Sequence, residues 1–345
     1  MQHFNKSFIS VTIIIIIGLS SCHSGHKHPV DDWSTLPKAT PLSQLKQTDF
    51  SPTLENAIST EKNTIYAPSL LLAMNKVRQI LGTGLVAKSS NSTDLKLLLS
   101  SISYINVLTD DEYTATTQVA DGKINVHAFF RKELPFETKL DVADSPIIFS
   151  GVKVAAFCLK GSSQGVCRKA RILYYKDDDN FILKFTPHDT SQEIILAKCP
   201  EHYTTLGDGV ERVNRYIKKG FQEEKEPKLN WKYYIGEDDY LSVPMISFDL
   251  ETNYNNLEGQ TLFTKENDSL LLITVYQRIG FKLNEHGAII ETEAEVTTAA
   301  AADEGKTRPQ YMLFDKPFLV ILRHTGAKLP YFVMLVNNSE LLIKK

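Results

Sequence analysis

The spacing of hydrophobic and polar residues changes part-way along the chain. Residues 63–81 (NTIYAPSLLLAMNKVRQIL) begin with β-prone residues, pass a proline and continue with apolar residues at helical spacing, which predicts a strand followed by a helix. Further helices are predicted over Asp94 to Tyr104 and over Asp208 to Lys219. From about Lys123 onward, the remaining segments are mostly β-rich runs separated by Gly, Asp and Asn, as in strands joined by turns.

These β-rich runs define the class of fold. RILYY, FILKF and EIILAK follow one another closely and predict a three-stranded meander. Later strand-like runs are YLSVPMISFDLE, LLITVYQRIGFKLNE, FLVILRH and YFVMLVNN. Because the helices are predicted mainly early in the chain and strands fill most of the rest, the expected fold class is α+β, with β-sheet dominating the later part of the chain.

The N-terminal residues are typical of an export signal. Lys6 is followed by an apolar stretch from Phe8 to Leu19, which suits a signal peptide and is too short for a convincing membrane span. The stretch ends in Leu-Ser-Ser-Cys, which resembles a bacterial lipoprotein box with Cys22 as the lipidated residue; a plain signal peptide is the alternative. We expect a signal peptide at 1–21, a polar tether and approach at 22–60 and one domain at 61–345. The mature protein would then be held at the bacterial cell envelope or surface through a lipid on Cys22.

Composition narrows the classes of partner. The chain has 345 residues and a net charge of −3, which provides no basic field for nucleic acid. It contains no phosphate-binding glycine loop, no dinucleotide fingerprint and no paired Cys-x-x-Cys cluster, so we expect no cofactor. An exported chain of this size without a catalytic signature favours a binding protein over an enzyme.

Four local patterns have a chemical and a structural interpretation. Gly161 to Gly165 fits the hydrolase pattern G-x-S-x-G with Ser163 as nucleophile, but a strand-like run comes after it where that motif needs a helix, which favours a hairpin turn. Asp177 to Asn180 could bind calcium or simply form a turn, and the same applies to Asp238 and Asp239. Histidines in the tether could bind metal or be solvated; they are His23, His26 and His28. Cys158 and Cys167 could form a hairpin disulfide, and with Cys199 they leave an odd number of thiols, for which buried structural cysteines are expected.

The C-terminal third of the chain resembles the end of a serpin. In that family a strand ending in Val-Asn-Glu-x-Gly leads into an exposed reactive loop, and Phe-x-Lys/Arg-Pro-Phe begins the next strand. Here Leu283–Gly287 (LNEHG) is similar to the first element and Phe314–Phe318 (FDKPF) to the second. Three earlier segments occur in the family's order, and they are IYAPS from Ile65, NVHAFFRKELPFE from Asn125 and VPMISFDLETNY from Val243.

The chain also departs from the serpin pattern. Glu133 and Leu134 precede Pro-Phe where the family has a tryptophan, and Met334 stands where serpins usually have glycine. The interval from Leu81 to Lys123 is short for the family. A helix and one or two strands of the central sheet are therefore expected to be missing or reduced.

The resemblance implies a mechanism for the loop. In inhibitory serpins a protease cuts the exposed loop, and the freed segment inserts as a new strand into the central sheet. The hinge of the loop would be Glu285, Gly287 and Ala288. Strand alternation beyond it would direct one set of residues inward (Ile290, Thr292, Ala294 and Val296) and another toward solvent (Glu291, Glu293 and Glu295). This charged, β-branched hinge predicts only a modest gain in stability after cleavage, and a helical linker over Glu293 to Ala302 is the alternative.

Two ways of counting locate the reactive bond. Counting back from the FDKPF motif puts the bond at Lys306–Thr307, whereas counting forward from Glu285 reaches Ala301. The stretch DEGKTRP is polar and glycine-containing, hence accessible to a protease, and a trypsin-like pocket presents a carboxylate to a basic side chain such as Lys306. Arg308 is a poorer candidate because Pro309 comes directly after it.

The sequence thus leaves three functions open. The first is an exported serpin-like inhibitor of serine or cysteine endopeptidases, with a trypsin-like protease as partner. The second is a non-inhibitory serpin-shaped binding or scaffold lipoprotein. The third, a hydrolase using Ser163, lacks the strand–turn–helix context that its motif requires.

Overall fold

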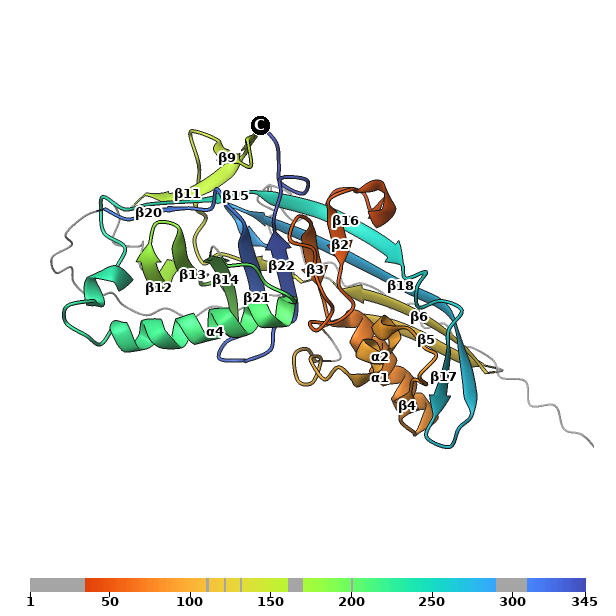
Figure 1. Ribbon diagram of the computed structural model, residues 1–345. Helices are drawn as coiled ribbons and strands as arrows, with labels where there is room; N and C mark the ends of the chain where they lie inside the picture. Colours follow the sequence, from red (N-terminus) through yellow and green to blue (C-terminus); the bar gives the residue numbers. More distant parts are fainter. Residues whose placement is uncertain are drawn as a thin grey trace, which may run out of the picture. The chain divides into compact units, whose positions relative to one another are not determined.

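The computed structural model describes residues 35–109, 112–120, 122–130, 132–160, 170–199, 201–289 and 309–345. In these ranges the chain forms three sheets of four or more strands, a two-stranded hairpin and three α-helices (Figure 1). The α+β class predicted from the sequence is confirmed. Residues 35–60, assigned to the tether and approach, include the strands β1 (Thr40–Pro41) and β2 (Thr48–Phe50) of these sheets.

The two early helices lie where their apolar spacing predicts them. Helix α1 (Ser69–Leu81) ends at Gly82, whose φ of 66° is the left-handed conformation that favours glycine after a helix. Helix α2 (Thr93–Ser100) begins after Ser92, whose hydroxyl accepts a hydrogen bond from the N–H of Leu95 at 3.2 Å. It ends four residues before the predicted Tyr104, because the backbone becomes extended at Ser101.

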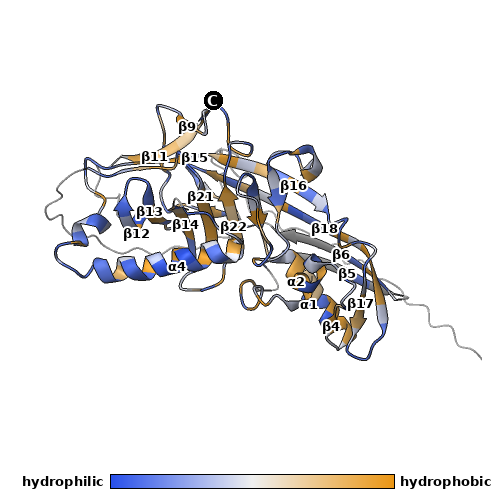
Figure 2. Ribbon diagram, in the orientation of Figure 1, coloured by the Kyte–Doolittle hydropathy of each residue, from blue (hydrophilic) through white to orange (hydrophobic). Residues whose placement is uncertain are grey.

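The third helix, α4 (Leu206–Glu223), is longer than predicted at both ends. The hydroxyl of Thr205 caps it by accepting the N–H of Asp208 at 3.0 Å. Gly220 lies against strand β12 (Ala170–Asp177) so closely that a Cβ atom would be 1.9 Å from the carbonyl oxygen of Leu173. Apolar residues recur on its inner face, whereas the outer face is polar (Figure 2). In the described part of the chain, no helix is both long and apolar enough to span a membrane.

A seven-stranded sheet carries α4. Its first three strands form the predicted antiparallel meander, which is confirmed. The order is β12 (Ala170–Asp177), β13 (Asn180–Phe185), β14 (Gln192–Lys198), β21 (Phe318–His324), β22 (Phe332–Val336), β3 (Asn63–Tyr66) and β2 (Thr48–Phe50). Segments from both ends of the sequence therefore meet in one sheet.

The larger, nine-stranded sheet is built around the long strand β18 (Ser269–Asn284). On one side β18 pairs antiparallel with β16 (Ile246–Asn253), and on the other it runs parallel to β6 (Lys123–Phe130) over eight residue pairs. The remaining strands are β1 (Thr40–Pro41), β4 (Leu85–Val86), β5 (Thr114–Ala120), β7 (Leu134–Pro135), β17 (Thr261–Thr264) and β19 (Gly287–Ala288). Among the described strands β5 pairs only with β6, so it forms an edge.

The two large sheets share one core. Inward side chains of β18 are fully buried, among them Val275, Ile279, Phe281 and Leu283. The ring of Phe281 stacks on that of Phe332 in β22, with ring centroids 4.5 Å apart. This contact joins the sheets directly.

Two smaller sheets and two short 3-10 helices complete the described structure. The four-stranded sheet has the order β20 (Tyr311–Leu313), β15 (Tyr240–Pro244), β11 (Ala156–Lys160) and β8 (Asp141–Val142). Strands β9 (Ile147–Phe149) and β10 (Val152–Val154) form a separate hairpin. The 3-10 helices are η1 (Leu42–Gln44) and η2 (Asn230–Tyr233).

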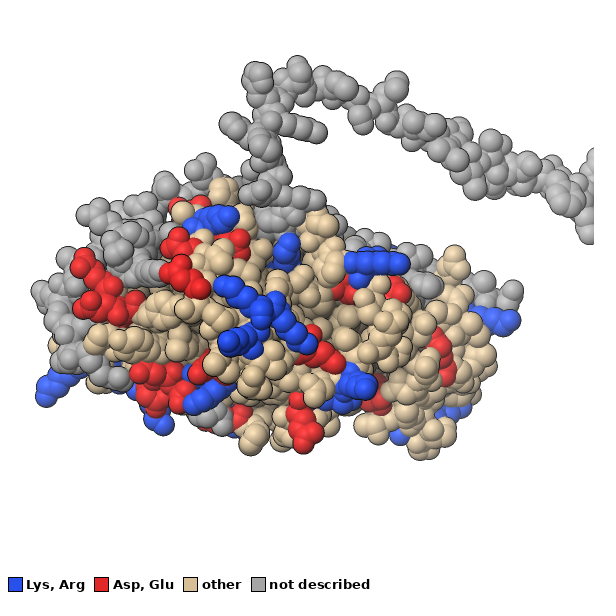
Figure 3. Space-filling view, turned by 90° about the horizontal axis from the view of Figure 1, so that it is seen from above, with Lys and Arg blue, Asp and Glu red and all other residues tan. Residues whose placement is uncertain are grey.

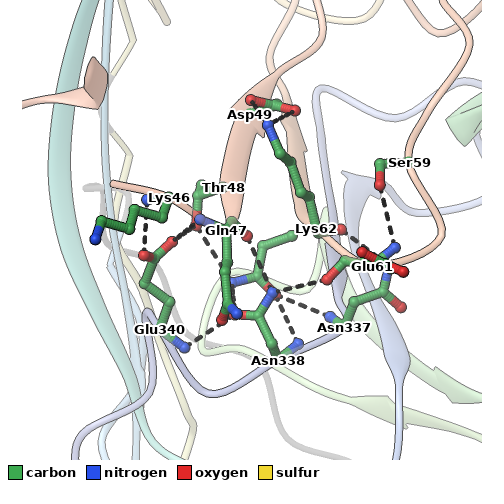
Figure 4. A network of polar contacts seen from close by, with 11 residues as sticks. Lys46, Gln47, Thr48, Asp49, Ser59, Glu61, Lys62, Asn337, Asn338 and Glu340 are labelled. Atoms are coloured by element: carbon green, nitrogen blue, oxygen red, sulfur yellow. Dashed lines mark hydrogen bonds and ion pairs between the residues drawn. The ribbon is translucent and has the colours of Figure 1, made fainter. Parts of the chain in front are cut away.

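A polar network joins residues 46–48, before and at the start of β2, to Asn338 and Glu340 near the C-terminus (Figure 4). The carboxylate of Glu340 accepts the backbone N–H groups of Lys46 and Gln47 at 2.9 Å each, and the hydroxyl of Thr48 at 2.8 Å. Nearby, the side-chain amide of Asn338 donates to the carbonyl oxygen of Gln47 at 3.0 Å. The segment after β22 therefore closes the compact unit against the segment before β2.

Candidate functional site

The predicted hinge is a tight turn with a strand directly after it. Asn284, the last residue of β18, pairs with Gly287, so only Glu285 and His286 form the turn. The side-chain oxygen of Asn284 accepts the N–H of His286 at 3.0 Å and holds the turn closed. The chain therefore reverses and runs back along β18.

The returning strand, β19, lies between β18 and β7. Ala288 is opposite Leu283 of β18 on one side and Leu134 of β7 on the other. The N–H of Ile289 continues the ladder by donating to the carbonyl oxygen of Lys282 at 2.9 Å. Ala288 and Ile289 are both 0% exposed. The first residues after the turn are thus already part of the nine-stranded sheet.

Gly287 is required where it stands. Its φ of 140° is unfavourable for any residue with a side chain, and a Cβ atom would be 2.3 Å from the carbonyl oxygen of Leu134. On the same segment, the N–H of Phe136 donates to the carbonyl oxygen of His286 at 2.7 Å. The backbones of the hinge and of β7 are therefore in close contact.

Glu285 contacts its neighbours through both its side chain and its backbone. Its carboxylate is 15% exposed and lies 3.9 Å from the ammonium nitrogen of Lys139 and 3.3 Å from Nε2 of His286. Its carbonyl oxygen accepts the N–H of Leu140 at 2.8 Å. All three predicted hinge residues, Glu285, Gly287 and Ala288, thus lie together at the end of β18.

A buried ion pair supports the same end of the sheet. Lys132, between β6 and β7, is 3% exposed, and its ammonium group pairs with the carboxylate of Glu112. The same carboxylate lies 3.4 Å from Nε2 of His324, at the end of β21. The ammonium nitrogen of Lys132 also lies 4.5 Å from the centre of the Tyr331 ring. These contacts tie β7, and with it the hinge, to both large sheets.

A second anchor lies near the start of the next described range, at Gln310. Gln310 is completely buried, and its backbone N–H donates to Oδ1 of Asp239 at 2.8 Å. Its side-chain amide donates to the carbonyl oxygen of Lys232 at 3.2 Å. Strand β20 begins at the next residue and runs parallel to β15. Residues 290–308 therefore connect the hinge in the large sheet to the edge of the four-stranded sheet.

Lys198 secures the FDKPF motif beyond this anchor. Its ammonium group is nearly buried at the end of β14, where it donates to the carbonyl oxygen of Leu313 at 2.8 Å and to Asp315 at 2.7 Å. It also pairs with Asp179 at 2.8 Å, which in turn accepts from Lys316 at 2.7 Å. Hydrogen bonds from Lys198 and Lys316 lower the pKa of Asp179.

The acidic run in the β12–β13 turn thus serves the fold around the loop. Asp177 accepts the N–H of Asp179 at 3.0 Å, as expected of a turn, and Asp178 accepts the N–H of Tyr311 at 3.2 Å. Among the described residues, no group of three or more His, Cys, Asp and Glu side chains is arranged to hold a metal ion. The turn interpretation of this run is the one that the contacts support.

Several predicted residues lie outside the described ranges. They are the reactive bond Lys306–Thr307, the lipid-anchor residue Cys22, the tether histidines, Ser163 and Cys167. Strand β12 comes after the Ser163 segment, in place of the helix that a hydrolase elbow needs. Cys158 is buried on β11, and its disulfide to Cys167 stays a prediction. Cys199 is buried as expected, and burial raises the pKa of its thiol to about 12.

The residues that hold the two ends of the loop were not found from the sequence. Asp239 was assigned to a turn, and Lys198 and Glu112 were not singled out. In the sequence, Leu313 is 115 residues from Lys198, and Lys132 is 20 residues from Glu112. Nothing in the local pattern distinguishes such residues from surface charges.

Comparisons with known proteins find a solved structure that this chain resembles. No protein-family model matches the chain, and no curated protein matches it. The chain is similar to protease nexin-1, a serpin, in its crystal structure with heparin, at 12% sequence identity and a TM-score of 0.37. The match covers 68% of this chain and 60% of that one, so less than two thirds of that protein is represented. At this extent of similarity, a function for the chain has to be argued from its own strands and contacts.

Proposed function

We propose that this chain is a serpin-like inhibitor of endopeptidases, and that residues 290–308 form its cleavable loop. The observation that carries the proposal is the position of β19, which lies between β18 and β7. The strand that leads into the loop has thereby begun to enter the sheet. A chain that only connected two sheets would have no need of a buried two-residue strand at this place.

The rest of the sheet favours further insertion. Beyond β19, β6 and β18 are parallel neighbours. A segment continuing from Ile289 would run antiparallel to both, because it comes after the turn from β18. It would replace one parallel ladder by two antiparallel ones, and antiparallel pairing is the more stable per residue. An uncut loop cannot take this course, because its far end is held at Gln310.

The register of β19 assigns the side chains of such a strand. Leu283 is fully buried and lies opposite Ala288, so even-numbered residues face the core. Continued in this register, Ile290, Thr292 and Ala294 would enter the core. Glu291, Glu293 and Glu295 would lie on the opposite side of the sheet, away from this core, on the side where Ile289 is also buried.

The proposed target is a trypsin-like protease acting at Lys306–Thr307. This choice rests on the basic side chain of Lys306 and on the polar, glycine-containing stretch around it. The proposed location is the bacterial cell envelope or surface, through a lipid on Cys22, as the apolar stretch before that cysteine indicates. Fractionation of cells carrying Cys22→Ala tests the location, since after a high-salt wash wild type should still sediment with membranes and the variant should not.

One observation favours the alternative, a binding protein without inhibition. The β6–β18 ladder is closed over eight residue pairs, and the segment still to enter begins with the bulky Ile290. Both features slow insertion, and a loop that inserts slowly is a substrate and not a trap.

Trypsin distinguishes the two functions. We would mix the full chain with equimolar trypsin, look for a complex that survives boiling in detergent, and sequence any new N-terminus. An inhibitor gives such a complex and a new N-terminus at Thr307, and Lys306→Ala removes both, whereas the matched Arg308→Ala does not. Clean cleavage after Lys306 without a complex assigns the binding function. Cleavage elsewhere shows the reactive bond to be wrong.

A further inference from the structure

One face of the molecule combines exposed apolar side chains with lysines. Ile148 of β9 lies opposite Lys153 of β10, so both side chains are on the same side of the hairpin. Ile148 is 60% exposed, which is unusual for an isoleucine in a strand. Its neighbours in sequence, Ile147 and Phe149, point the other way and are buried.

The last residues of the chain extend this face. The backbone of Lys345 donates to the carbonyl oxygen of Lys153 at 3.2 Å, and the N–H of Ala155 donates to that of Ile343 at 2.7 Å. In this pairing Ile343 and Lys345 share the outer side of the hairpin with Ile148 and Lys153. Ile343 is 36% exposed. Lys344 is also exposed, but it pairs with the buried Val154, so its side chain leaves the strand on the other side and lies at the border of this face. We call Ile148, Lys153, Ile343, Lys344 and Lys345 the lysine face.

The charges on this face are not neutralised within the described structure. None of its three lysines forms an ion pair with a described residue, and the nearby carboxylate of Glu340 is occupied by the backbone of Lys46 and Gln47 (Figure 4). Seen from above the view of Figure 1, Lys and Arg side chains gather near the middle of the molecule (Figure 3). In Figure 1, β9 and the C-terminus lie at this upper end.

We propose that the lysine face docks on an anionic lipid surface. Lysines bordering a few exposed apolar side chains are the combination that binds such surfaces, with the charges at the headgroups and the apolar groups at the acyl boundary. A single lipid chain gives only marginal attachment, so a basic patch is an effective second element.

The position of Thr35, the first described residue, favours a lipid surface as the partner. The carbonyl oxygen of Thr35 accepts the ammonium group of Lys282 at 3.2 Å. Lys282 pairs with Ser247, whose N–H donates to the carbonyl oxygen of Leu341, two residues before Ile343. Thr35 therefore lies on the same end of the molecule as the lysine face. Cys22 is 13 residues upstream, a reach of at most about 45 Å, so an anchor there would hold this end near the membrane. This step rests on the lipid anchor of the proposed function.

Vesicle binding tests the face apart from the anchor. We would use the full chain with Cys22→Ala, which carries no lipid, and measure its partitioning onto phosphatidylcholine vesicles with and without about 30% phosphatidylglycerol. Neutral vesicles measure the contribution of the apolar N-terminus. We expect stronger binding to the anionic vesicles, and lysines near such a surface predict a difference on the order of a hundredfold at low salt. High salt should remove most of it.

Two triple variants test which lysines cause the preference for anionic vesicles. Replacing Lys153, Lys344 and Lys345 by Gln should abolish the preference for anionic vesicles, and Ile148→Ser should weaken binding to them. Replacing Lys218, Lys225 and Lys228 by Gln removes the same charge from exposed positions on and after α4 and should leave the preference unchanged. Equal binding to both vesicle types, or equal loss in both triple variants, would overturn the proposal, and binding of an acidic protein instead of lipid would do so as well. Trypsin trapping and Cys22 fractionation are separate measurements, so their failure is distinguishable from failure here.

Discussion

Arg278 and Asp249 face each other on the outer side of the nine-stranded sheet, joined by hydrogen bonds of 2.8 Å from Nε and 2.5 Å from Nη2. Asp249 is almost buried, whereas the guanidinium is partly exposed. If the strand that begins at β19 continued in the register of Ala288 opposite Leu283, Glu293 would lie opposite Arg278. The outer face of β18 thus offers a cation to one of the glutamates that are atypical for a serpin hinge.

Cutting the loop should raise the thermal midpoint only modestly. Residues up to Ile289 are already paired in the sheet, so part of the gain from insertion is present before cleavage. Arg278→Gln should reduce the rise after cleavage by about 1–2 °C, because an opposite-charge cross-strand pair contributes roughly 0.5 kcal/mol. The comparison is between cut and uncut forms of each variant, which cancels the loss of the Asp249 contact. A very large rise in wild type would show that insertion is complete and fast.

Gly287→Ala should destabilise the hinge more than a glycine substitution elsewhere. The new Cβ would meet the carbonyl oxygen of Leu134 and adopt an unfavourable φ, so we expect a loss of more than about 2 kcal/mol in the free energy of unfolding. Gly326→Ala is the control. Gly326 also has a positive φ, of 77°, but nothing lies within 4 Å of the position of a Cβ atom, so this substitution should cost only about 1 kcal/mol. Urea unfolding measures both, and equal losses would show that the contact with β7 is unimportant.

Glu112→Gln should be costly and should change the response to acid. Removing the carboxylate leaves Lys132 buried without its carboxylate partner, which costs about 3 kcal/mol. Burial alone would raise the pKa of Glu112, but the hydrogen bond from Lys132 and the other contacts lower it below its ordinary 4.5. A lowered pKa stabilises the folded state above about pH 4.5, and the contribution is lost as the pH falls through the folded-state value.

The stability difference between wild type and Glu112→Gln should therefore shrink as the pH falls below about 4.5. Unfolding measured from about pH 7 down to about pH 3 checks this. A difference that stays constant over that range would contradict the charged pair.

Asp239→Ala should loosen the far end of the loop. The variant leaves the N–H groups of Gln310 and Gly236 without their acceptor, and an unsatisfied buried donor costs about 1–3 kcal/mol. Hydrogen exchange should accelerate at Gln310 and at Tyr240, whose N–H bonds to the carbonyl oxygen of Gln310. The neighbouring Asp238 is exposed, so Asp238→Ala should leave both rates unchanged.

Elements with a strong local pattern were predictable from the sequence. The helix α1, the helix predicted over Asp208 to Lys219 within α4 and the β12–β14 meander arise from interactions within a few residues, and the structure confirms them. The positions of Glu285, Gly287 and Ala288 at the end of β18 were also predictable, through the likeness of LNEHG to a known motif. The inward and outward alternation expected after the hinge needs only the two-residue period of a strand, and it stays a prediction because residues 290–308 lie outside the described ranges.

The pairing of these elements was decided by the tertiary structure. That β6 lies parallel to β18, that β19 enters beside β7 and that Thr35 lies near the last strand pairing of the chain involve partners far apart in sequence. Lys198, Asp239 and Glu112 also have partners that the sequence does not reveal. In the sequence they resemble ordinary surface charges, and their partners lie close to them only in the folded chain. Local patterns record which face of an element is apolar, but the energy of an ion pair or a backbone contact depends on distance in space, and only the folded chain sets that distance.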